Sequence, residues 1–255
     1  MGFEMLEEIL AKSGIVTAFL FVGLMVWISY WISGRLTRGR IHGSAIAITL
    51  GLVLAYIGGK ITGGSNGIAD FTMLGGVAIL GGAMFRDFAI VATAFGADLE
   101  TIKKAGVLGG ISVVLGVVVS FAVGGIVAVA FGFTDAVSIT TIGAGAATYI
   151  VGPVTGTALG ASSDVIALSV AAGLVKSVLV MIGTPIVAPL IGLNNPRSAM
   201  VYGGLMGTTS GVAGGLAATD PKLVPYGAMT ATFYTGAGCL LAPSVLFLLV
   251  RAITG

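Results

Sequence analysis

Charged residues are scarce in this chain. They make up 9% of its 255 residues, whereas hydrophobic residues make up 56%. A soluble domain of this length could not cover its surface with so few charges, so the composition predicts a polytopic membrane protein. The apolar runs are continuous and do not alternate with polar residues, which favours membrane-spanning helices over the strands of a membrane barrel.

Residue types that carry much of enzyme and metal chemistry are also scarce. The chain has one cysteine, Cys239, and one histidine, His42. An internal disulfide is therefore excluded, and no Cys/His cluster could ligate a metal ion. His42 lies in a basic loop, where we interpret it as a residue at headgroup level and not as a proton relay. The patterns GxxxxGK[ST] and HExxH are missing, so nucleotide-driven transport and metal-dependent hydrolysis are unsupported, and we expect no enzyme.

The length of the apolar runs predicts the fold class. A bilayer core takes about 20 apolar residues per helix, and by that rule the runs allow about eight segments. The sequence therefore predicts an all-α polytopic membrane protein with one integral membrane domain over residues 1–255, in which two segments are discontinuous or re-entrant helices. Apolar spans are expected at residues 13–32, 44–62, 71–96, 105–131, 165–191 and 226–250, of which the last is interrupted by Pro243.

The placement of positive charge predicts the orientation. Arg35, Arg38 and Arg40 form the sharpest charge cluster in the chain. The positive-inside rule puts this loop in the cytoplasm and the N-terminus outside. Arg86 and Asp87 leave two alternatives open: the span ends near Phe85, or the pair is buried within a longer helix. Topology after residue 131 depends on whether the two broken segments cross the membrane or re-enter it.

Two stretches rich in Gly, Thr and Ser interrupt the apolar pattern. They cover residues 140–163 and 208–220, and each begins with Thr-Thr-x-Gly and continues to Ala-Ala-Thr. Backbone that leaves helical pairing inside a bilayer must be satisfied by protein, water or an ion. A pair of such stretches in corresponding positions of a hydrophobic chain points to the binding site of a transporter. The alternative is that both stretches are small-residue motifs for helix packing.

Lys176 lies near the middle of a predicted span. A lysine at that depth needs an anionic partner or a watery cavity, because its insertion costs about 2.5–3.5 kcal/mol. Positions one turn away hold no acid, so no local salt bridge is expected. We interpret Lys176 as a cation that neutralises an anionic ligand or stays fixed within a moving part; a snorkelling or salt-bridged structural lysine is the alternative.

The candidate site residues follow from these features. Half-helix N-termini direct backbone amides at anions, and unwound carbonyls with Thr or Ser hydroxyls can ligate sodium. The predicted anion-binding residues are Thr140, Thr141, Gly143, Gly145, Lys176, Thr208, Thr209, Ser210 and Gly211. The predicted sodium ligands are Thr148, Thr155 and Thr219. Arg86 and Arg197 are candidate gates, although both suit plain interface or loop charges. Asp135 and the cluster Ser162–Asp164 are predicted helix N-caps.

Longer strings carry a family resemblance. They include SYWISGRLTRGRIHGSAIAI, GGAMFRDFAIVATAFG, TTIGAGAATYIVGPVTG and PLIGLNNPRSAMVYGGLMGTTSGVAGGLAATDPKLVPYGAMTATFYTG. Together they resemble MadM, the larger subunit of the bacterial two-component malonate–sodium symporter. The resemblance implies malonate uptake coupled to sodium in the cytoplasmic (inner) membrane. It also implies a smaller MadL-like membrane partner. Membrane lipid is a further expected partner and nucleic acid is not, and a higher oligomer of the two-subunit unit is left open.

The expected mechanism follows from the resemblance and the site residues. Importing a dianion against an inside-negative potential costs about 4.6 kcal/mol at 100 mV, so uptake needs co-transported cations or a steep inward gradient. We expect the tips of the two broken stretches to meet and bind the dicarboxylate, with Lys176 beside it, and alternating access by an elevator-like slide. The alternative is the membrane subunit of a sodium-pumping decarboxylase. Such a pump should use a buried carboxylate, and no Asp or Glu lies clearly mid-span.

Overall fold

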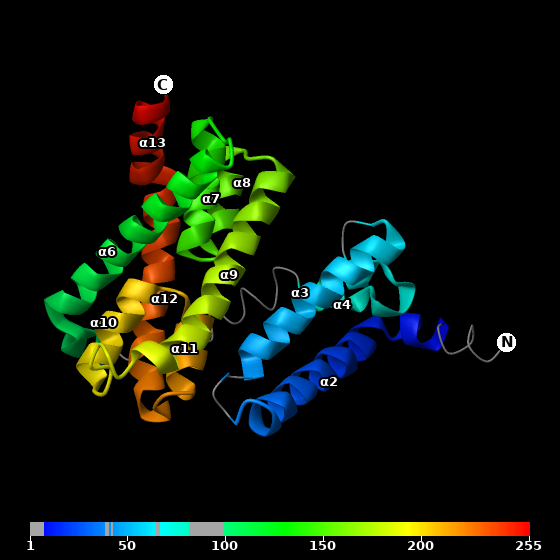
Figure 1. Ribbon diagram of the computed structural model, residues 1–255. Coiled ribbons are helices and arrows are strands. Elements are labelled where there is room, and N and C mark those ends of the chain that lie inside the picture. The colour runs from blue at the N-terminus through cyan, green and yellow to red at the C-terminus, as the bar shows by residue number, and fades with distance from the viewer. Residues whose placement is uncertain (1–7, 39–40, 42, 65–66, 82–98) are drawn as a thin grey trace. The chain divides into compact units, whose positions relative to one another are not determined.

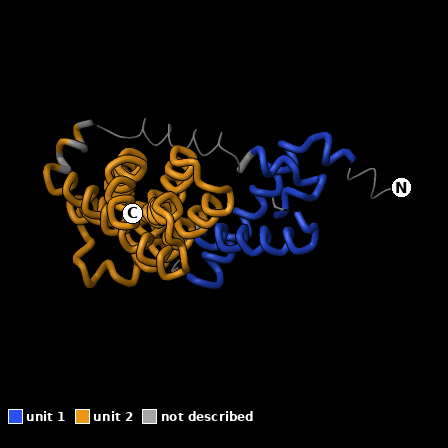
Figure 2. Tube along the Cα trace, turned by 90° about the horizontal axis from the view of Figure 1, so that it is seen from above, with its two compact units in different colours: residues 1–95 blue, residues 96–255 orange. Residues whose placement is uncertain are grey.

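The computed structural model describes residues 8–38, 41, 43–64, 67–81 and 99–255. The chain divides into two compact units, Met1–Phe95 and Gly96–Gly255 (Figure 2). Within the described ranges every regular element is a helix. Five of these helices are long and apolar enough to cross a membrane: Gly14–Arg35, Ala45–Thr62, Gly106–Ala130, Ser163–Val187 and Pro221–Thr254. The all-α class is therefore confirmed, with five membrane-length helices in the described part of the chain where about eight segments were predicted.

The first unit is built on a pair of long helices. Its elements are α2 (Gly14–Arg35), α3 (Gly43–Thr62), η1 (Gly67–Asp70), η2 (Thr72–Leu74) and α4 (Gly76–Gly81). Ser33 at the end of α2 donates its hydroxyl to the carbonyl of Ile41, 2.6 Å away, which ties the loop between α2 and α3 to the helix. The spans predicted at 13–32 and 44–62 are confirmed. Most of the span predicted at 71–96 lies outside the described residues.

In the second unit, long helices alternate along the chain with pairs of short helices (Figure 1). Its elements are α6 (Leu99–Ala130), α7 (Ala136–Ala147), α8 (Val151–Leu159), α9 (Ser163–Val187), α10 (Pro196–Met206), α11 (Thr209–Ala217), η3 (Pro221–Leu223), α12 (Val224–Leu241), the π-helical turn η4 (Ala242–Leu246) and α13 (Phe247–Thr254). The predicted N-caps are confirmed: Asp135 accepts the amide of Ser138 at 2.8 Å, and Ser162 accepts the amide of Val165 at 3.4 Å.

Helices α7 and α8 form an antiparallel hairpin, the first hairpin. Gly156 near the end of α8 faces Thr141 near the middle of α7, and Gly152 faces Gly145. Later residues of α8 thus lie beside earlier residues of α7, so the chain reverses between them. We call Thr148–Ile150 the first tip, where Thr148 is extended at φ −152° and ψ 155°.

Helices α10 and α11 form the second hairpin. Gly203 of α10 lies against Gly227 of α12, and Gly207 lies against Tyr234, so α10 and α12 run parallel. Leu216 of α11 also lies against Gly227, although it follows Gly207 in the chain, so α11 runs the opposite way. The reversal occurs at Gly207–Thr208, the second tip, where Gly207 has φ +73°.

The two hairpins lie at opposite ends of the second unit (Figure 1). α9 packs against α7, α8 and α11, while α12 packs against α10, α11 and α6. Gly145 and Gly173 are close-approach points, because a Cβ on either would overlap backbone of the neighbouring helix. The hairpins therefore enter the unit from opposite ends and point toward its middle.

Three segments differ from the predicted boundaries. The helix predicted to begin at residue 105 begins at Leu99 instead, with a break at Gly106 (φ 61°, ψ −168°). α9 ends at Val187 and not at residue 191, two residues before Pro189. In the first broken stretch, Thr140–Ala147 belongs to regular helix, and the break comes only at the first tip. Gly is tolerated there because close packing against α6 and α9 compensates for its weak helix propensity.

Candidate functional site

The first tip follows the C-terminal end of α7, and the last carbonyl of that helix faces Lys176. Thr148 is fully buried, at 2% exposure, and its hydroxyl accepts the amides of Ile150 (3.1 Å) and Val151 (3.3 Å). The threonine thereby caps the start of α8. The last carbonyl of α7, that of Ala147, is left for a partner outside the helix. This carbonyl lies at the negative end of the α7 dipole, where a cation is stabilised.

The second tip begins a helix without a side-chain cap. Thr208 occupies the N-cap position of α11, but its hydroxyl hydrogen-bonds the hydroxyl of Ser177 and no amide of α11. Among the described residues, the amides of Thr209, Ser210 and Gly211 donate to no backbone carbonyl. The hydroxyl oxygen of Ser210 is buried and has no partner there either. A buried helix N-terminus with free amides is a ready anion site.

Lys176 lies between the two tips. Its ammonium donates to three oxygens, which belong to Ser120 (Oγ, 2.9 Å), Ala147 (carbonyl, 2.9 Å) and Tyr234 (hydroxyl, 3.2 Å). It also lies 5.0 Å from the centroid of the Tyr234 ring. In the part of the chain that the structure describes, no carboxylate forms an ion pair with Lys176. The predicted mid-span lysine is therefore a cation held by neutral oxygens.

Neighbouring residues of α9 connect both tips. Lys176 binds the end of α7 at the first tip, while Ser177 binds Thr208 at the second. Tyr234 completes the arrangement: its ring lies against Gly207, and its hydroxyl donates to the carbonyl of Gly116 on α6 at 3.1 Å. The middle of the unit thus brings together a negative helix end, a positive helix end and a lysine.

The predicted residues on α7 belong to regular helix, and Gly145 comes nearest to the first tip, since a Cβ on Gly173 would meet both its carbonyl oxygen and the amide nitrogen of Tyr149. Thr141 donates its hydroxyl to the carbonyl of Val137 within its own helix, at 2.8 Å. Gly143 lies against Phe121, and Gly145 lies against Ser169. These glycines let helices approach closely, which is the packing role. Thr140 is fully buried, and its hydroxyl has no partner among the described residues.

The predicted sodium ligands differ in whether their oxygens are engaged. Thr148 caps α8, and Thr219 donates to the carbonyl of Gly215 at 2.8 Å. Thr155 is fully buried in α8, and its hydroxyl has no partner within the described ranges. Of the three, Thr155 alone therefore has a hydroxyl whose hydrogen-bonding capacity is wholly unused.

Of the two candidate gates, only Arg197 lies among the described residues, and it is far from the second tip. Arg86 and His42 lie outside the described residues. Arg197 is exposed in the first turn of α10, at the far end of that helix from the second tip. With 11 residues, α10 is about 16 Å long, so Arg197 is remote from the tip. It lines a groove of about 870 Å³ between α6, α9 and α10, in which Asn195 and Ser198 are its polar neighbours.

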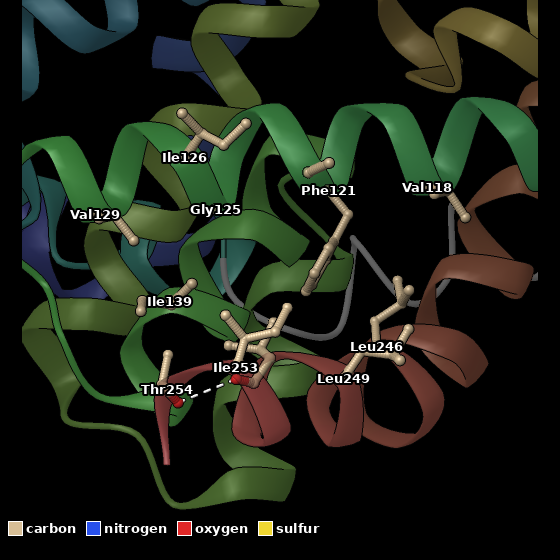
Figure 3. A pocket seen from close by; sticks show the side chains of 12 residues that line it. Val118, Phe121, Gly125, Ile126, Val129, Ile139, Leu246, Leu249, Ile253 and Thr254 are labelled. Atoms are coloured by element: carbon tan, nitrogen blue, oxygen red, sulfur yellow. Dashed lines mark hydrogen bonds between the residues drawn. The ribbon is translucent and has the colours of Figure 1, made fainter.

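A second cavity, between α6, α7 and α13, offers almost no polar groups that could bind an anion (Figure 3). Its volume is about 410 Å³, and apolar side chains such as Phe121, Ile139 and Leu249 line it. The one hydroxyl in the lining belongs to Thr254, which donates to the carbonyl of Val250 at 3.0 Å. A charged ligand would lose its hydration there without compensation.

Sequence reasoning missed Ser120, Ser177 and Tyr234. Each is a common residue type within an apolar helix, and Ser120 and Tyr234 lie 56 and 58 positions from Lys176. The one available signal was the requirement of Lys176 for polar partners. That requirement says a partner exists but does not say on which helix.

Comparison with known proteins identifies the family. Residues 6–254 match the family model described as the malonate/sodium symporter MadM subunit. No curated protein and no solved structure matches the chain significantly. The match covers nearly the whole chain, and five membrane-length helices in the described residues agree with a transporter. The chain is an integral membrane protein and belongs to the MadM family of malonate/sodium symporter subunits.

Proposed function

We propose that this chain binds malonate at the second tip and imports it together with sodium by alternating access. The observation that carries the proposal is the uncapped start of α11 beside Lys176. Free amides of Thr209, Ser210 and Gly211 can receive one carboxylate, because the helix dipole and the amides both favour an anion. Lys176 can neutralise the other carboxylate, since no described acid is paired with it.

Lys176 and the second tip are close enough to share a small ligand. Ser177, the next residue of α9, hydrogen-bonds Thr208, and the Tyr234 ring lies against both Gly207 and Lys176. The lysine carries its charge on a flexible four-carbon stem, so it can turn from its present oxygens toward a carboxylate. The Lys176 ammonium and the free amides at the start of α11 can each bind one carboxylate, so together they suit a short dianion better than a monoanion.

We also propose that both hairpins are re-entrant. Their arms have 9 to 12 residues, or roughly 14–18 Å, which is too short for a hydrocarbon core of about 30 Å. Arg197 lies at the start of α10 and Lys222 just after α11, so both lie at the end of the unit where the second hairpin begins, whereas Arg251 lies on α13, which packs against α7 at the opposite end. The positive-inside rule then places the second hairpin on the cytoplasmic side of the inner membrane.

Orientation and motion follow from this placement. With the arginine loop after α2 also in the cytoplasm, the N-terminus lies outside. Both tips are tied to α9, so they would move together. We propose an elevator-like slide of this unit against a scaffold that includes the smaller partner subunit, by analogy with transporters built from paired broken helices.

Reconstitution tests the function directly. Liposomes containing this chain and its smaller partner should accumulate labelled malonate when sodium is outside, and accumulation should saturate with malonate. Replacing sodium by choline should abolish accumulation, because the dianion alone would enter against the membrane potential. Uptake that neither saturates nor responds to sodium would indicate a channel and contradict the proposal.

The sodium-pumping decarboxylase alternative has weak support. The carboxylates described in the second unit are those of Glu100, Asp135, Asp164 and Asp220, and each lies at or near a helix end. None of these described acids is placed for proton–sodium exchange in the middle of a membrane-length helix. Malonate accumulation without any biotin-carrying partner would separate the two functions.

Thr155 is our proposed sodium ligand, because its buried hydroxyl has no protein partner in the described residues. Replacing it with valine keeps the shape and removes the oxygen, so we expect about tenfold weaker sodium activation of uptake, the effect of one lost ligand interaction. The matched control is Thr219→Val, because the hydroxyl of Thr219, two residues after α11, already donates to the Gly215 carbonyl. Equal sodium dependence in the two variants would remove Thr155 from the sodium site.

A further inference from the structure

The oxygens around Lys176 form a site for a cation, whichever cation occupies it. We call the Ser120 hydroxyl, the Ala147 carbonyl and the Tyr234 hydroxyl the Lys176 cage. They come from α6, from the end of α7 and from α12. An ammonium has three N–H donors, and here each cage oxygen accepts one. The tethered ammonium of Lys176 thus takes the place that a free cation could take.

The donor set of the cage suits sodium. Neutral hydroxyl and carbonyl oxygens are the ligands of hard cations, and carbonyls at half-helix C-termini coordinate sodium in other transporters. The Ala147 carbonyl is the last of α7, so the helix dipole adds negative potential there. The Tyr234 hydroxyl donates its proton to the Gly116 carbonyl, which leaves its lone pairs toward the cage.

We propose that sodium and the Lys176 ammonium occupy the cage alternately, and that malonate binding determines which of the two is bound there. This inference rests on the proposed malonate site. When a carboxylate at the second tip draws the ammonium of Lys176 toward itself, the cage oxygens lose their partner and can receive sodium. Without malonate the ammonium stays in the cage and repels sodium.

This exchange explains coupling without a carboxylate in the site. Malonate binding without sodium leaves buried oxygens unsatisfied, which is unfavourable. Sodium binding in the cage without malonate requires two cations at one place. Each ligand therefore favours the other, and the coupling must be reciprocal.

Sodium binding to the purified full-length chain tests the exchange. The probe is radioactive sodium, titrated with and without malonate in a choline chloride background. Malonate should raise the sodium affinity of the unaltered protein by about tenfold, within the usual range of coupling. Lys176→Ala should bind sodium without malonate, at the affinity that the unaltered protein shows with malonate, because truncation empties the cage.

Removing single cage oxygens gives a second, independent readout. Tyr234→Phe and Ser120→Ala should each lower sodium affinity in the presence of malonate by about tenfold. The matched controls are Tyr202→Phe and Ser112→Ala, whose hydroxyls bond to Thr184 and to the Gly109 carbonyl outside the cage. These controls should leave sodium affinity unchanged.

The outcomes separate this inference from the malonate site itself. If folded Lys176→Ala loses malonate binding but still fails to bind sodium alone, the exchange is wrong and the malonate site stands. If it binds malonate as the unaltered protein does, the malonate site is wrong, and the exchange with it. If Lys176→Ala does not fold, unchanged sodium affinity in both Tyr234→Phe and Ser120→Ala overturns the exchange.

Discussion

Replacing Lys176 with methionine is expected to weaken malonate binding by about 30-fold to 4,000-fold. The ammonium is held by three neutral oxygens and is paired with no described acid, so its charge is free for a carboxylate. Removing one partner of a buried charge pair costs about 2–5 kcal/mol, and each 1.4 kcal/mol is about tenfold in affinity. Methionine keeps most of the stem and its packing. Binding of labelled malonate to the purified protein at saturating sodium measures the loss.

Two further variants make this result specific. Lys222→Met removes a lysine from the exposed turn before α12 and should leave malonate affinity unchanged. Lys176→Arg keeps the charge but changes the donor geometry, so it should recover part of the affinity. Malonate affinity in Lys176→Met equal to that of the unaltered protein would exclude Lys176 from the site.

The sequence predicted the structure best where a segment or residue has few physically acceptable environments. The first two spans, α6 and the N-caps at Asp135 and Ser162 were all predictable, because membrane length and capping leave few alternatives. The importance of Lys176 was predictable for the same reason. Its three oxygen partners were not, because each lies on a different element, and only tertiary packing brings them together.

The two Thr-Thr-x-Gly strings show the limit of reading repeats. Thr140 and Thr141 lie inside the first arm of the first hairpin, whereas Thr208 and Thr209 lie at the tip and start of the second arm of the other. Residues that match in sequence therefore occupy different positions in the two hairpins. Both strings consist of small and hydroxyl residues. In α7 these residues allow close helix packing, whereas in the second hairpin they form the uncapped start of α11.

The contrast between the hairpins is consistent with different roles for the two tips in the proposed transport. The first tip presents the Ala147 carbonyl, which attracts cations, and the second tip presents free amides, which attract anions. α9 passes both tips and contributes Lys176 to one and Ser177 to the other. A dianion and its driving ion would thus bind at opposite helix ends, with one lysine between them.

Gly207→Ala is expected to destabilise the protein by about 2–5 kcal/mol and to abolish malonate uptake. Gly207 has φ +73°, a conformation that costs other residues about 1–2 kcal/mol, and a Cβ there would overlap the Tyr234 ring, which adds about 1–3 kcal/mol of overpacking. Gly160 is the matched control, because it has the same φ of +73° but open space around it. Gly160→Ala should therefore cost only the conformational part. The midpoint of thermal unfolding in detergent and uptake in liposomes measure both variants. Equal losses of thermal stability and of uptake in the two variants would mean that the contact between Gly207 and Tyr234 does not stabilise the proposed site. The arrangement of both tips around Lys176 would then need another explanation.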